Sequence, residues 1–313
     1  MKKKDRLLKL FRIYSSNLRF HAPELENNFV CPICFSIFPE TALESKQITI
    51  EHIIPESLGG TFVTLTCRDC NNRGGTILDS NLVNRFKHED ILAGKHSAPL
   101  RAKFTVGSED ITADIYLSTT TDPNIKVVGL PELNDPKKIE QVNKALDSGT
   151  KDFKFSGNLG YIDLASRISV LKIAYLMAFS YFGYSYIKFP FLDPIRKQIM
   201  NSTEETEIMK GIVNLAHLPF EKSCITVLKK PDNLKCFFVT LDLSTKLNRY
   251  VGVALPGFDV ENIIYDHWAN IDYADESMKS SVIKPIQYNE EILMDEKYKN
   301  YAHLAWNIIQ NSE

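Results

Sequence analysis

The sequence predicts an α+β protein in two parts, and three observations lead to that prediction. First, two pairs of cysteines with the same spacing enclose two strand-like segments, residues 47–51 and 61–66. Second, residues 163–187 form a long apolar segment whose hydrophobic residues recur at helical spacing. Third, residues 226–243 and 250–255 are rich in β-branched and aromatic residues, which is typical of a hairpin or meander.

The composition places the chain among ordinary globular proteins. It has 313 residues, of which 44% are hydrophobic and 24% charged, and a net charge of −2. These values exclude a wholly disordered, collagen-like or coiled-coil protein. No overall basic excess indicates nucleic acid as a partner. The basic residues gather at the N-terminus instead, where residues 1–20 hold seven Lys or Arg and one Asp.

The sequence predicts a cytoplasmic protein with no membrane partner. Lys9 and Arg12 interrupt the apolar stretch near the N-terminus, so no signal-peptide core of about 7–15 apolar residues is present. The best candidate for a membrane span, Ile173 to Ile187, is shorter than the length of about 20 apolar residues that a span needs. We therefore expect it to be part of a buried core helix.

The N-terminal elements follow from hydrophobic spacing and turn residues. We expect a helix over residues 5–20, strands over 47–51 and 61–66 joined by a turn at Gly59-Gly60, and a helix over 77–87. Gly74-Gly75 is unfavourable inside a helix, so we expect a short turn directly after Cys70 rather than a continuous helix.

The sequence changes in character after His88, and we place the domain boundary at residue 94. We expect strands over 103–106 and 111–117, a turn and polar helix over 131–145, and helices over 193–200 and 301–309. The aromatic run from Tyr175 to Phe191 is interpreted as core, because Lys and Arg are sparse within it. Residues 1–94 are thus one predicted domain, and residues 95–313 are a mixed α+β domain that could serve recognition, sensing or oligomerisation.

Four of the six cysteines have the spacing of a metal site. They form the pairs Cys31/Cys34 and Cys67/Cys70, separated by 32 residues. Two residues between sulfurs let both thiolates of a pair reach one ion at about 2.3 Å, and two such pairs complete a tetrahedron. Two disulfides are the alternative, but a reducing cytosol favours structural zinc. The other two, Cys224 and Cys236, lack this spacing and are interpreted as buried free thiols.

The residues between and after the cysteine pairs are suited to phosphodiester chemistry. Glu51 and Asn71 offer the hard oxygen ligands that Mg²⁺ or Mn²⁺ prefers. His52 is a side chain that can act as a general base near neutral pH. Zinc binding could bring Asn71, which directly follows Cys70, back beside Glu51 and His52. A divalent ion and a base around one point are what hydrolysis of a phosphodiester requires.

At these residues the chain resembles a known family. The run CPIC, then ITIEHIIPESLGG, then LTCRDCNNRGG resembles an HNH nuclease of the zinc-stapled type, and the resemblance covers about residues 29–86. It implies a β-hairpin followed by a helix around one catalytic metal, the ββα-metal fold. The fold class predicted for the whole chain is therefore α+β, with a zinc-stapled ββα-metal domain followed by a mixed α+β domain that contains a long buried helix.

The resemblance implies a role for each matching residue. His52 corresponds to the general base, Glu51 to the acidic metal ligand and Asn71 to the second metal ligand. The four cysteines correspond to the ligands of a structural zinc ion: Cys31, Cys34, Cys67 and Cys70. The catalytic ion would be Mg²⁺ or Mn²⁺. Arg68 and Arg73 lie where contacts to phosphate or to the cleaved strand would fall.

Three features depart from the family pattern. Glu51 stands where Asp is commoner. The central Asn of the family is usually found a few residues before the second cysteine pair, where this chain has Phe62-Val63-Thr64. We therefore expect the loop to be braced differently here. No second His follows on the helix, so metal binding would depend on Glu51, Asn71 and water.

The resemblance implies hydrolysis of DNA, with RNA as another substrate, and a single-metal site that nicks one strand. It also implies a setting in bacterial restriction or anti-phage defence. The alternative from another class is a zinc-dependent module that binds nucleic acid or protein without cleaving it. A third version keeps the nuclease but makes residues 95–313 a homodimer contact or the docking site of a regulatory partner.

Overall fold

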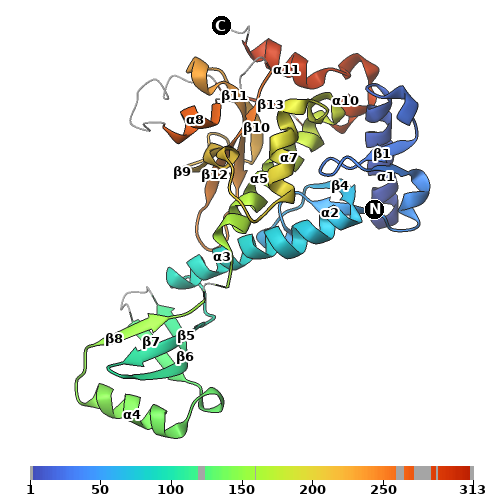
Figure 1. Ribbon diagram of the computed structural model, residues 1–313. Coiled ribbons are helices and arrows are strands. Elements are labelled where there is room, and N and C mark those ends of the chain that lie inside the picture. Colours follow the sequence, from blue (N-terminus) through green and yellow to red (C-terminus); the bar gives the residue numbers. More distant parts are fainter. Residues whose placement is uncertain are drawn as a thin grey trace. The chain divides into compact units, whose positions relative to one another are not determined.

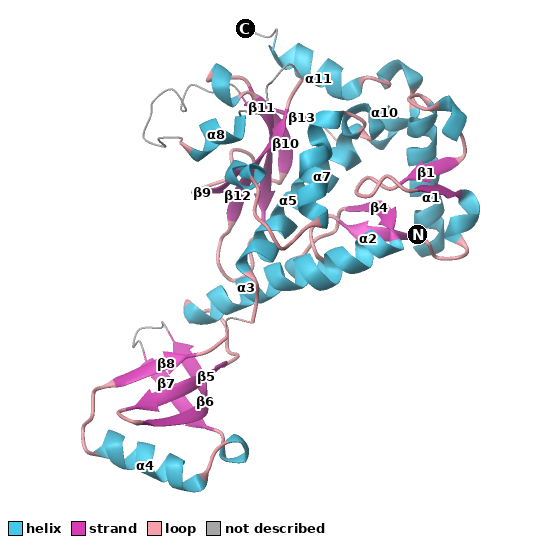
Figure 2. Cartoon of the chain, in the orientation of Figure 1, coloured by secondary structure: helices cyan, strands magenta, loops and turns pink. Residues whose placement is uncertain are grey.

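The computed structural model describes residues 3–118, 124–158, 160–258, 264–270, 283–286 and 288–310. It has mixed helices and sheets, as predicted (Figures 1 and 2). The α-helices are α1 (Lys3–Arg19), α2 (Arg68–Arg73), α3 (Ser80–Leu92), α4 (Pro136–Asp147), α5 (Asp163–Phe182), α6 (Tyr184–Ile187), α7 (Asp193–Met200), α8 (Ile264–Ala269), α10 (Glu290–Met294) and α11 (Tyr301–Gln310).

The strands form four antiparallel sheets among the described residues. They are β1 (Asn28–Val30), β2 (Ile37–Pro39), β3 (Ile48–His52), β4 (Val63–Cys67), β5 (Leu100–Val106), β6 (Glu109–Ser118), β7 (Asn124–Gly129), β8 (Phe153–Ser156), β9 (Ile212–Leu215), β10 (Cys224–Leu228), β11 (Cys236–Asp242), β12 (Tyr250–Pro256) and β13 (Ile283–Ile286). Two hairpins, β1–β2 and β3–β4, lie in the N-terminal part, and sheets of four and five strands follow.

The chain divides into two compact units. The first contains Met1–Leu82, Leu164–Ser244 and Asn248–Glu313, and the second contains Val83–Asp163 and Thr245–Leu247. Neither unit ends at residue 94, where the sequence analysis placed a boundary. The N-terminal hairpins share their unit with α5 and the five-stranded sheet. Whether residues 1–94 act as a functional domain stays a prediction.

The long helix α5 is the centre of the first unit, and it confirms the predicted buried helix. From Ile173 to Phe179 every side chain is buried. Tyr14 of α1 stacks on Phe179, with ring centroids 4.4 Å apart. Near the end of the helix, Phe182 contacts Phe237 of β11, with ring centroids 5.0 Å apart. The interpretation of the aromatic run as core is confirmed from Tyr175 to Tyr186.

The predicted helix over 163–187 is broken at one residue. Gly183 has a φ of +57° and separates α5 from α6. A Cβ at Gly183 would lie 2.2 Å from Oδ1 of Asn17. This oxygen accepts a hydrogen bond from the backbone N–H of Tyr184 at 2.8 Å. A close approach of α1 therefore decides where the helix ends, and the sequence spacing alone could not reveal it.

The five-stranded sheet has the order β13-β10-β11-β12-β9. The antiparallel pairs β10–β11 and β11–β12 confirm the predicted meander. Cys224 and Cys236 lie in this sheet as buried free thiols, also as predicted. The sheet is covered by α5 and α6, where the Tyr186 hydroxyl donates to the carbonyl of Pro256 at 2.6 Å.

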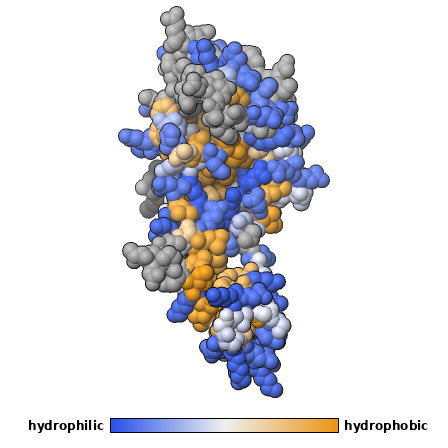
Figure 3. Space-filling view, turned by 90° about the vertical axis from the view of Figure 1, so that its left-hand side faces the viewer, coloured by the Kyte–Doolittle hydropathy of each residue, from blue (hydrophilic) through white to orange (hydrophobic). Residues whose placement is uncertain are grey.

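The second unit is a four-stranded sheet, β7-β6-β5-β8, with α4 packed on it. Phe104, Ile111 and Val142 belong to its small core. Apolar side chains, among them Phe153 and Ile125, are also exposed on this unit, and Figure 3 shows apolar side chains at its surface. The predicted strands and the polar helix of this region are confirmed.

Within the described residues, none of the helices combines the length and the apolar character needed to cross a membrane.

Candidate nuclease and metal site

The two cysteine pairs meet at one point. Their four Sγ atoms all lie within 4.8 Å of one another. Cys31 and Cys34 lie in the turn between β1 and β2, where Phe35 has a φ of +59° and its N–H bonds back to the Cys31 carbonyl at 2.9 Å. Cys67 ends β4, and Cys70 lies in the first turn of α2. The β3–β4 hairpin and α2 thus bring the second pair to the first.

The sulfur arrangement fits a tetrahedral thiolate metal site. Sulfurs about 2.3 Å from a central zinc would be about 3.8 Å apart, and the Sγ atoms of Cys34 and Cys67 are 3.7 Å apart. The backbone N–H groups of Cys67 and Cys70 donate to the sulfurs of Cys31 and Cys67, each at 3.4 Å. No disulfide joins these cysteines. The disulfide alternative is therefore wrong, and the donor set is that of a structural metal such as zinc.

The β3–β4 hairpin holds the predicted site residues Glu51 and His52 in a defined register. Glu51 pairs with Thr64, and His52 pairs with Val63 at the end of the strand. The loop closes with the N–H of Ile53 donating to the carbonyl of Phe62 at 3.0 Å. The predicted turn at Gly59-Gly60 is present: Gly59 has a φ of +82°, and a Cβ on Gly60 would lie 1.8 Å from the Ile54 carbonyl oxygen.

Thr64 supplies a different brace for the hairpin, as the missing Asn led us to expect. A hydrogen bond of 2.8 Å joins its Oγ1 to the hydroxyl of Tyr14 on α1, and both groups are buried. Desolvation raises the pKa of Tyr14 well above its usual value, so the phenol stays neutral. The N-terminal helix therefore packs directly on the hairpin.

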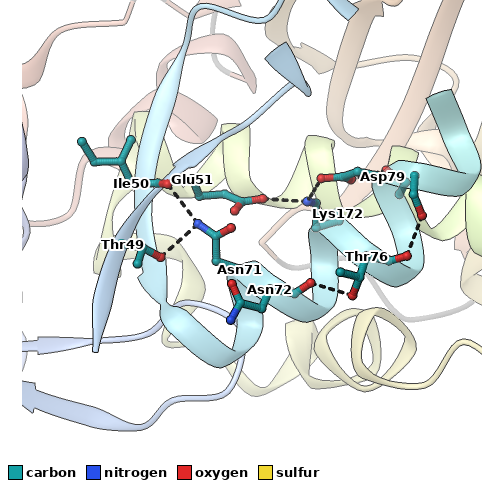
Figure 4. A network of polar contacts seen from close by, with 10 residues as sticks. Thr49, Ile50, Glu51, Asn71, Asn72, Thr76, Asp79 and Lys172 are labelled. Atoms are coloured by element: carbon teal, nitrogen blue, oxygen red, sulfur yellow. Dashed lines mark hydrogen bonds and ion pairs between the residues drawn. The ribbon is translucent and has the colours of Figure 1, made fainter. Parts of the chain in front are cut away.

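Asn71 is anchored to β3 by its amide nitrogen. Nδ2 donates to Oγ1 of Thr49 at 3.0 Å and to the carbonyl of Ile50 at 2.9 Å. Figure 4 shows the nitrogen turned toward the strand. The amide oxygen accepts no hydrogen bond from any residue that the structure describes. It is therefore an available hard ligand, which fits the metal role that the sequence analysis assigned to Asn71.

Glu51 lies on the same face of the hairpin, but its surroundings are unexpected. It is buried, and its Oε1 is 2.7 Å from Nζ of Lys172 on α5. The same ammonium group lies 2.6 Å from Oδ2 of Asp79 (Figure 4). The second oxygen, Oε2, accepts no hydrogen bond from the described residues. One carboxylate oxygen of Glu51 thus remains for a cation, next to an ammonium that holds the other.

In this ion-pair cluster, burial and the neighbouring charges shift the pKa of each group in opposite directions. Desolvation raises the pKa of Glu51 above its usual value, and Lys172 offsets only part of that effect. For Lys172, desolvation works to lower the pKa, but the charges of Glu51 and Asp79 outweigh it and raise the pKa. Lys172 is therefore a cation inside the protein, and it is the group that favours the ionised form of Glu51.

Sequence reasoning missed Lys172 and Asp79. The available signal was the single lysine in the middle of the apolar segment 163–187, since a lysine that is fully buried needs an anionic partner. Its partners could not be named, because Glu51 is 121 residues away in the chain.

His52 is the last residue of β3 and is half-buried. Successive side chains of a strand point to opposite faces, so His52 and Glu51 leave the strand on different sides. The predicted base and the predicted metal ligands can meet one substrate group only around the end of β3. No described residue makes a hydrogen bond to the His52 ring, which leaves both ring nitrogens available.

The two arginines differ in their surroundings. Arg68 is exposed at the start of α2, and no described residue pairs with its guanidinium group. Arg73 donates a hydrogen bond to the backbone carbonyl of Met200 at the end of α7. Arg68 is thus free to bind a phosphate, whereas Arg73 has a structural contact.

The helical segment after the second cysteine pair is continuous, and the predicted interruption at Gly74-Gly75 is wrong. The chain passes from α2 through a π-helical stretch, Gly74–Asp79, into α3. A Cβ on Gly74 would lie 3.1 Å from Nζ of Lys172. The absence of a side chain at Gly74 therefore gives the lysine room to reach its partners.

Comparison with known families identifies this region. Residues 31–87 match the family model of the HNH endonucleases. The match begins at the first cysteine and ends within α3, so it contains both cysteine pairs, the hairpin, Asn71 and Asp79. No curated protein and no solved structure matches the chain.

Proposed function

We propose that the protein is a metal-dependent endonuclease that hydrolyses DNA phosphodiester bonds, because residues 31–87 match the family model of the HNH endonucleases. The family match, with an anchored Asn71 beside a metal-type cysteine cluster, is the observation that supports it. Zinc would hold the two cysteine pairs together, and Mg²⁺ or Mn²⁺ would be the catalytic ion. A role in restriction or anti-phage defence stays a prediction.

In this proposal each residue has a defined task. His52 accepts a proton from the attacking water, because no residue that the structure describes makes a hydrogen bond to its ring nitrogens. Asn71 and Glu51 would hold the divalent ion with one oxygen each. A bound ion would polarise the phosphoryl group and stabilise the leaving oxygen. Arg68 binds a neighbouring phosphate at the exposed start of α2, a contact that positions the strand without reading its sequence.

The DNA would bind around the end of β3. His52 and the pair of Glu51 and Asn71 lie on different faces of the hairpin, and only the strand end gives both access to one phosphodiester. Because the domain presents one such set of residues, one copy of the chain would cut one strand. Cutting both strands would require two copies.

The test is a nicking assay on supercoiled plasmid DNA with Mg²⁺, Mn²⁺ or EDTA, after zinc content has been measured at about one per chain. We expect metal-dependent nicking by the wild type. In His52→Ala we expect a loss of at least about 100-fold, since general-base catalysis contributes about 10²–10⁴-fold. DNA binding and zinc content should stay unchanged. His217→Ala, which removes an exposed histidine, is the matched control and should nick normally.

The alternative, a zinc-dependent binding module, has one observation in its favour. Lys172 already neutralises part of the Glu51 charge, which weakens the attraction of this carboxylate for a second cation. Folded, zinc-loaded protein that binds DNA but leaves it intact with either ion would support the module. In that case the His52→Ala variant would bind DNA as the wild type does.

A further inference from the structure

Three segments far apart in the sequence meet at the ammonium group of Lys172. Its side chain is 1% exposed, and Nζ lies 2.7 Å from Oε1 of Glu51 and 2.6 Å from Oδ2 of Asp79. Glu51 comes from β3, Asp79 from the end of the π-helical stretch, and Lys172 from the middle of α5. Figure 4 shows the lysine between the two carboxylates.

Asp79 is itself held by α5. Its second oxygen, Oδ1, accepts a hydrogen bond from Oγ of Ser169 at 2.6 Å. Ser169 and Lys172 are three residues apart, so they lie on the same side of the helix. One turn of α5 thus binds both oxygens of Asp79 and one oxygen of Glu51, and the carboxylate of Glu51 is fixed from outside its own hairpin.

This cluster is a weak source of stability. Moving charges out of water costs several kcal/mol per ion, and buried ion pairs are often no more stabilising than apolar residues of the same size. The cluster has a formal charge of −1, from two carboxylates and one ammonium. Its definite effect is therefore geometric: it holds Glu51 in one orientation, with one oxygen bound to Lys172 and the other without a partner among the described residues.

We propose that Lys172, held in place by Asp79, is a positioning residue that orients Glu51 for the divalent ion which Glu51 and Asn71 bind. The inference rests on the proposed function, because that ion is the cofactor of the proposed nuclease. Lys172 does not touch the ion or the substrate. It acts through Glu51. In other metal sites, residues that hydrogen-bond to a metal ligand orient that ligand, and their loss weakens metal affinity by about 10–100-fold.

The decisive variant changes two residues at once. Lys172→Met alone would leave the carboxylates of Glu51 and Asp79 without a cation, which would change the charge of the site as well as its geometry. Lys172→Met combined with Asp79→Asn keeps the formal charge at −1 and removes the contact that holds Glu51 together with the ion pair between Lys172 and Asp79. The matched control is Arg167→Met with Glu205→Gln, because it removes one ion pair of 2.7 Å from the same helix at a more exposed position, where the two side chains are 31% and 48% exposed.

The first measurement is Mn²⁺ binding by electron paramagnetic resonance on zinc-loaded protein without DNA. Binding at the site is defined as the part that is lost in Asn71→Ala. We expect the Mn²⁺ dissociation constant of the double variant to rise about 10–100-fold, and that of the Arg167/Glu205 control to stay unchanged. In the nicking assay, the Mg²⁺ concentration for half-maximal rate should rise while the rate at saturating Mg²⁺ approaches that of the wild type.

Unchanged or tighter Mn²⁺ binding in a folded double variant would overturn the inference. Tighter binding in particular would mean that Lys172 competes with the cation instead of orienting its ligand. Absence of Mn²⁺ binding at this site in the wild type would overturn it as well. Wild-type protein that binds Mn²⁺ but never nicks DNA would refute the proposed nuclease, and the Mn²⁺ comparison would still decide the role of Lys172.

A second variant decides the question if the double variant does not fold. Gly74→Ala places a Cβ 3.1 Å from Nζ of Lys172 and 3.4 Å from its Cδ, while a Cβ on the neighbouring Gly75 meets nothing within 4 Å. Gly74→Ala should displace the lysine and weaken Mn²⁺ binding several-fold, and Gly75→Ala should not. Equal Mn²⁺ affinity in the two alanine variants would contradict the proposal.

Discussion

Glu51 and His52 are neighbours in the sequence, yet their surroundings differ completely. Glu51 is buried against a lysine from α5, and burial raises the pKa of its carboxyl group. His52 is half-buried and has no partner among the described residues. The residue types predict a metal ligand beside a base. Whether Glu51 or His52 is restrained depends on the face of the strand to which each side chain points.

His21 gives a prediction for the pH dependence of stability. Burial, together with the nearby charges of Lys188 and Lys299, lowers its pKa from 6.5 to about 4. Its Nδ1 faces Nζ of Lys188 at 3.2 Å. The unfolded chain therefore takes up a proton before the folded protein does. This contribution to stability is fully present above about pH 6.5 and is lost as the pH falls toward 4.

The measurement is the melting temperature between pH 7.5 and pH 4.5. The decrease toward acid should be smaller in His21→Gln than in the wild type, by a modest amount because His21 is partly exposed. His217→Gln changes an exposed histidine and should follow the wild-type curve. Parallel curves for all three proteins would contradict the assignment. Titration of the cysteine cluster occurs in every variant and cancels in the comparison.

At the scale of elements, glycines decide where the chain turns and what can approach it. Gly183 ends α5 because α1 lies too close for a Cβ, and Gly74 lets Lys172 reach two carboxylates. In both cases the requirement comes from another element. A rule that only ranks glycine as a poor helix former predicts a break at both places, yet the helical segment from α2 to α3 continues through Gly74 while α5 ends before Gly183.

Gly60 in the β3–β4 loop gives a prediction about the hairpin. A Cβ there would lie 1.8 Å from the carbonyl oxygen of Ile54, so the loop must shift to accept Gly60→Ala. We expect the free energy of unfolding to fall by about 1–3 kcal/mol, measured by urea denaturation. Nicking should fall too, because His52 lies directly before this loop. Gly75→Ala is the control and should not destabilise, since its Cβ has free space.

At the scale of the whole molecule, the proposed nuclease domain depends on the rest of its compact unit. Tyr14 stacks on Phe179, Glu51 pairs with Lys172, and the hydroxyl of Tyr175 donates to the carbonyl of Pro32 in the first cysteine pair at 2.7 Å. All three partners come from α5. The compact unit therefore crosses the boundary at residue 94 that the sequence indicated.

This dependence predicts the behaviour of a fragment. Residues 1–94 alone would expose the surfaces of α1 and β3 that α5 contacts and would leave the Glu51 carboxylate without its cation. We expect the fragment, even with zinc, to give poorly dispersed amide resonances in an NMR spectrum and to lack cooperative thermal unfolding. The full chain is the reference. A zinc-loaded fragment that unfolds cooperatively near the melting temperature of the full chain would show that residues 1–94 fold independently.

Short spacings along the chain were enough to predict several parts of this protein. The cysteine pairs, the acid-histidine segment and Asn71 lie within about 60 residues, so local spacing was enough to indicate the metal cluster and the family. The alternation of strands and the spacing of apolar residues in α5 were likewise local signals. Each of these patterns depends on residues that are neighbours in one element or in one short hairpin.

The way the site is held depends on contacts between segments that are far apart in the chain. Lys172 is 121 residues from Glu51, Tyr14 is 50 residues from Thr64, and the break at Gly183 depends on Asn17, which is 167 residues from its hydrogen-bond partner Tyr184. Such contacts form when apolar faces of distant elements pack together, and a buried polar group must then find its partner within that packing. No single segment contains the information about which group that partner will be.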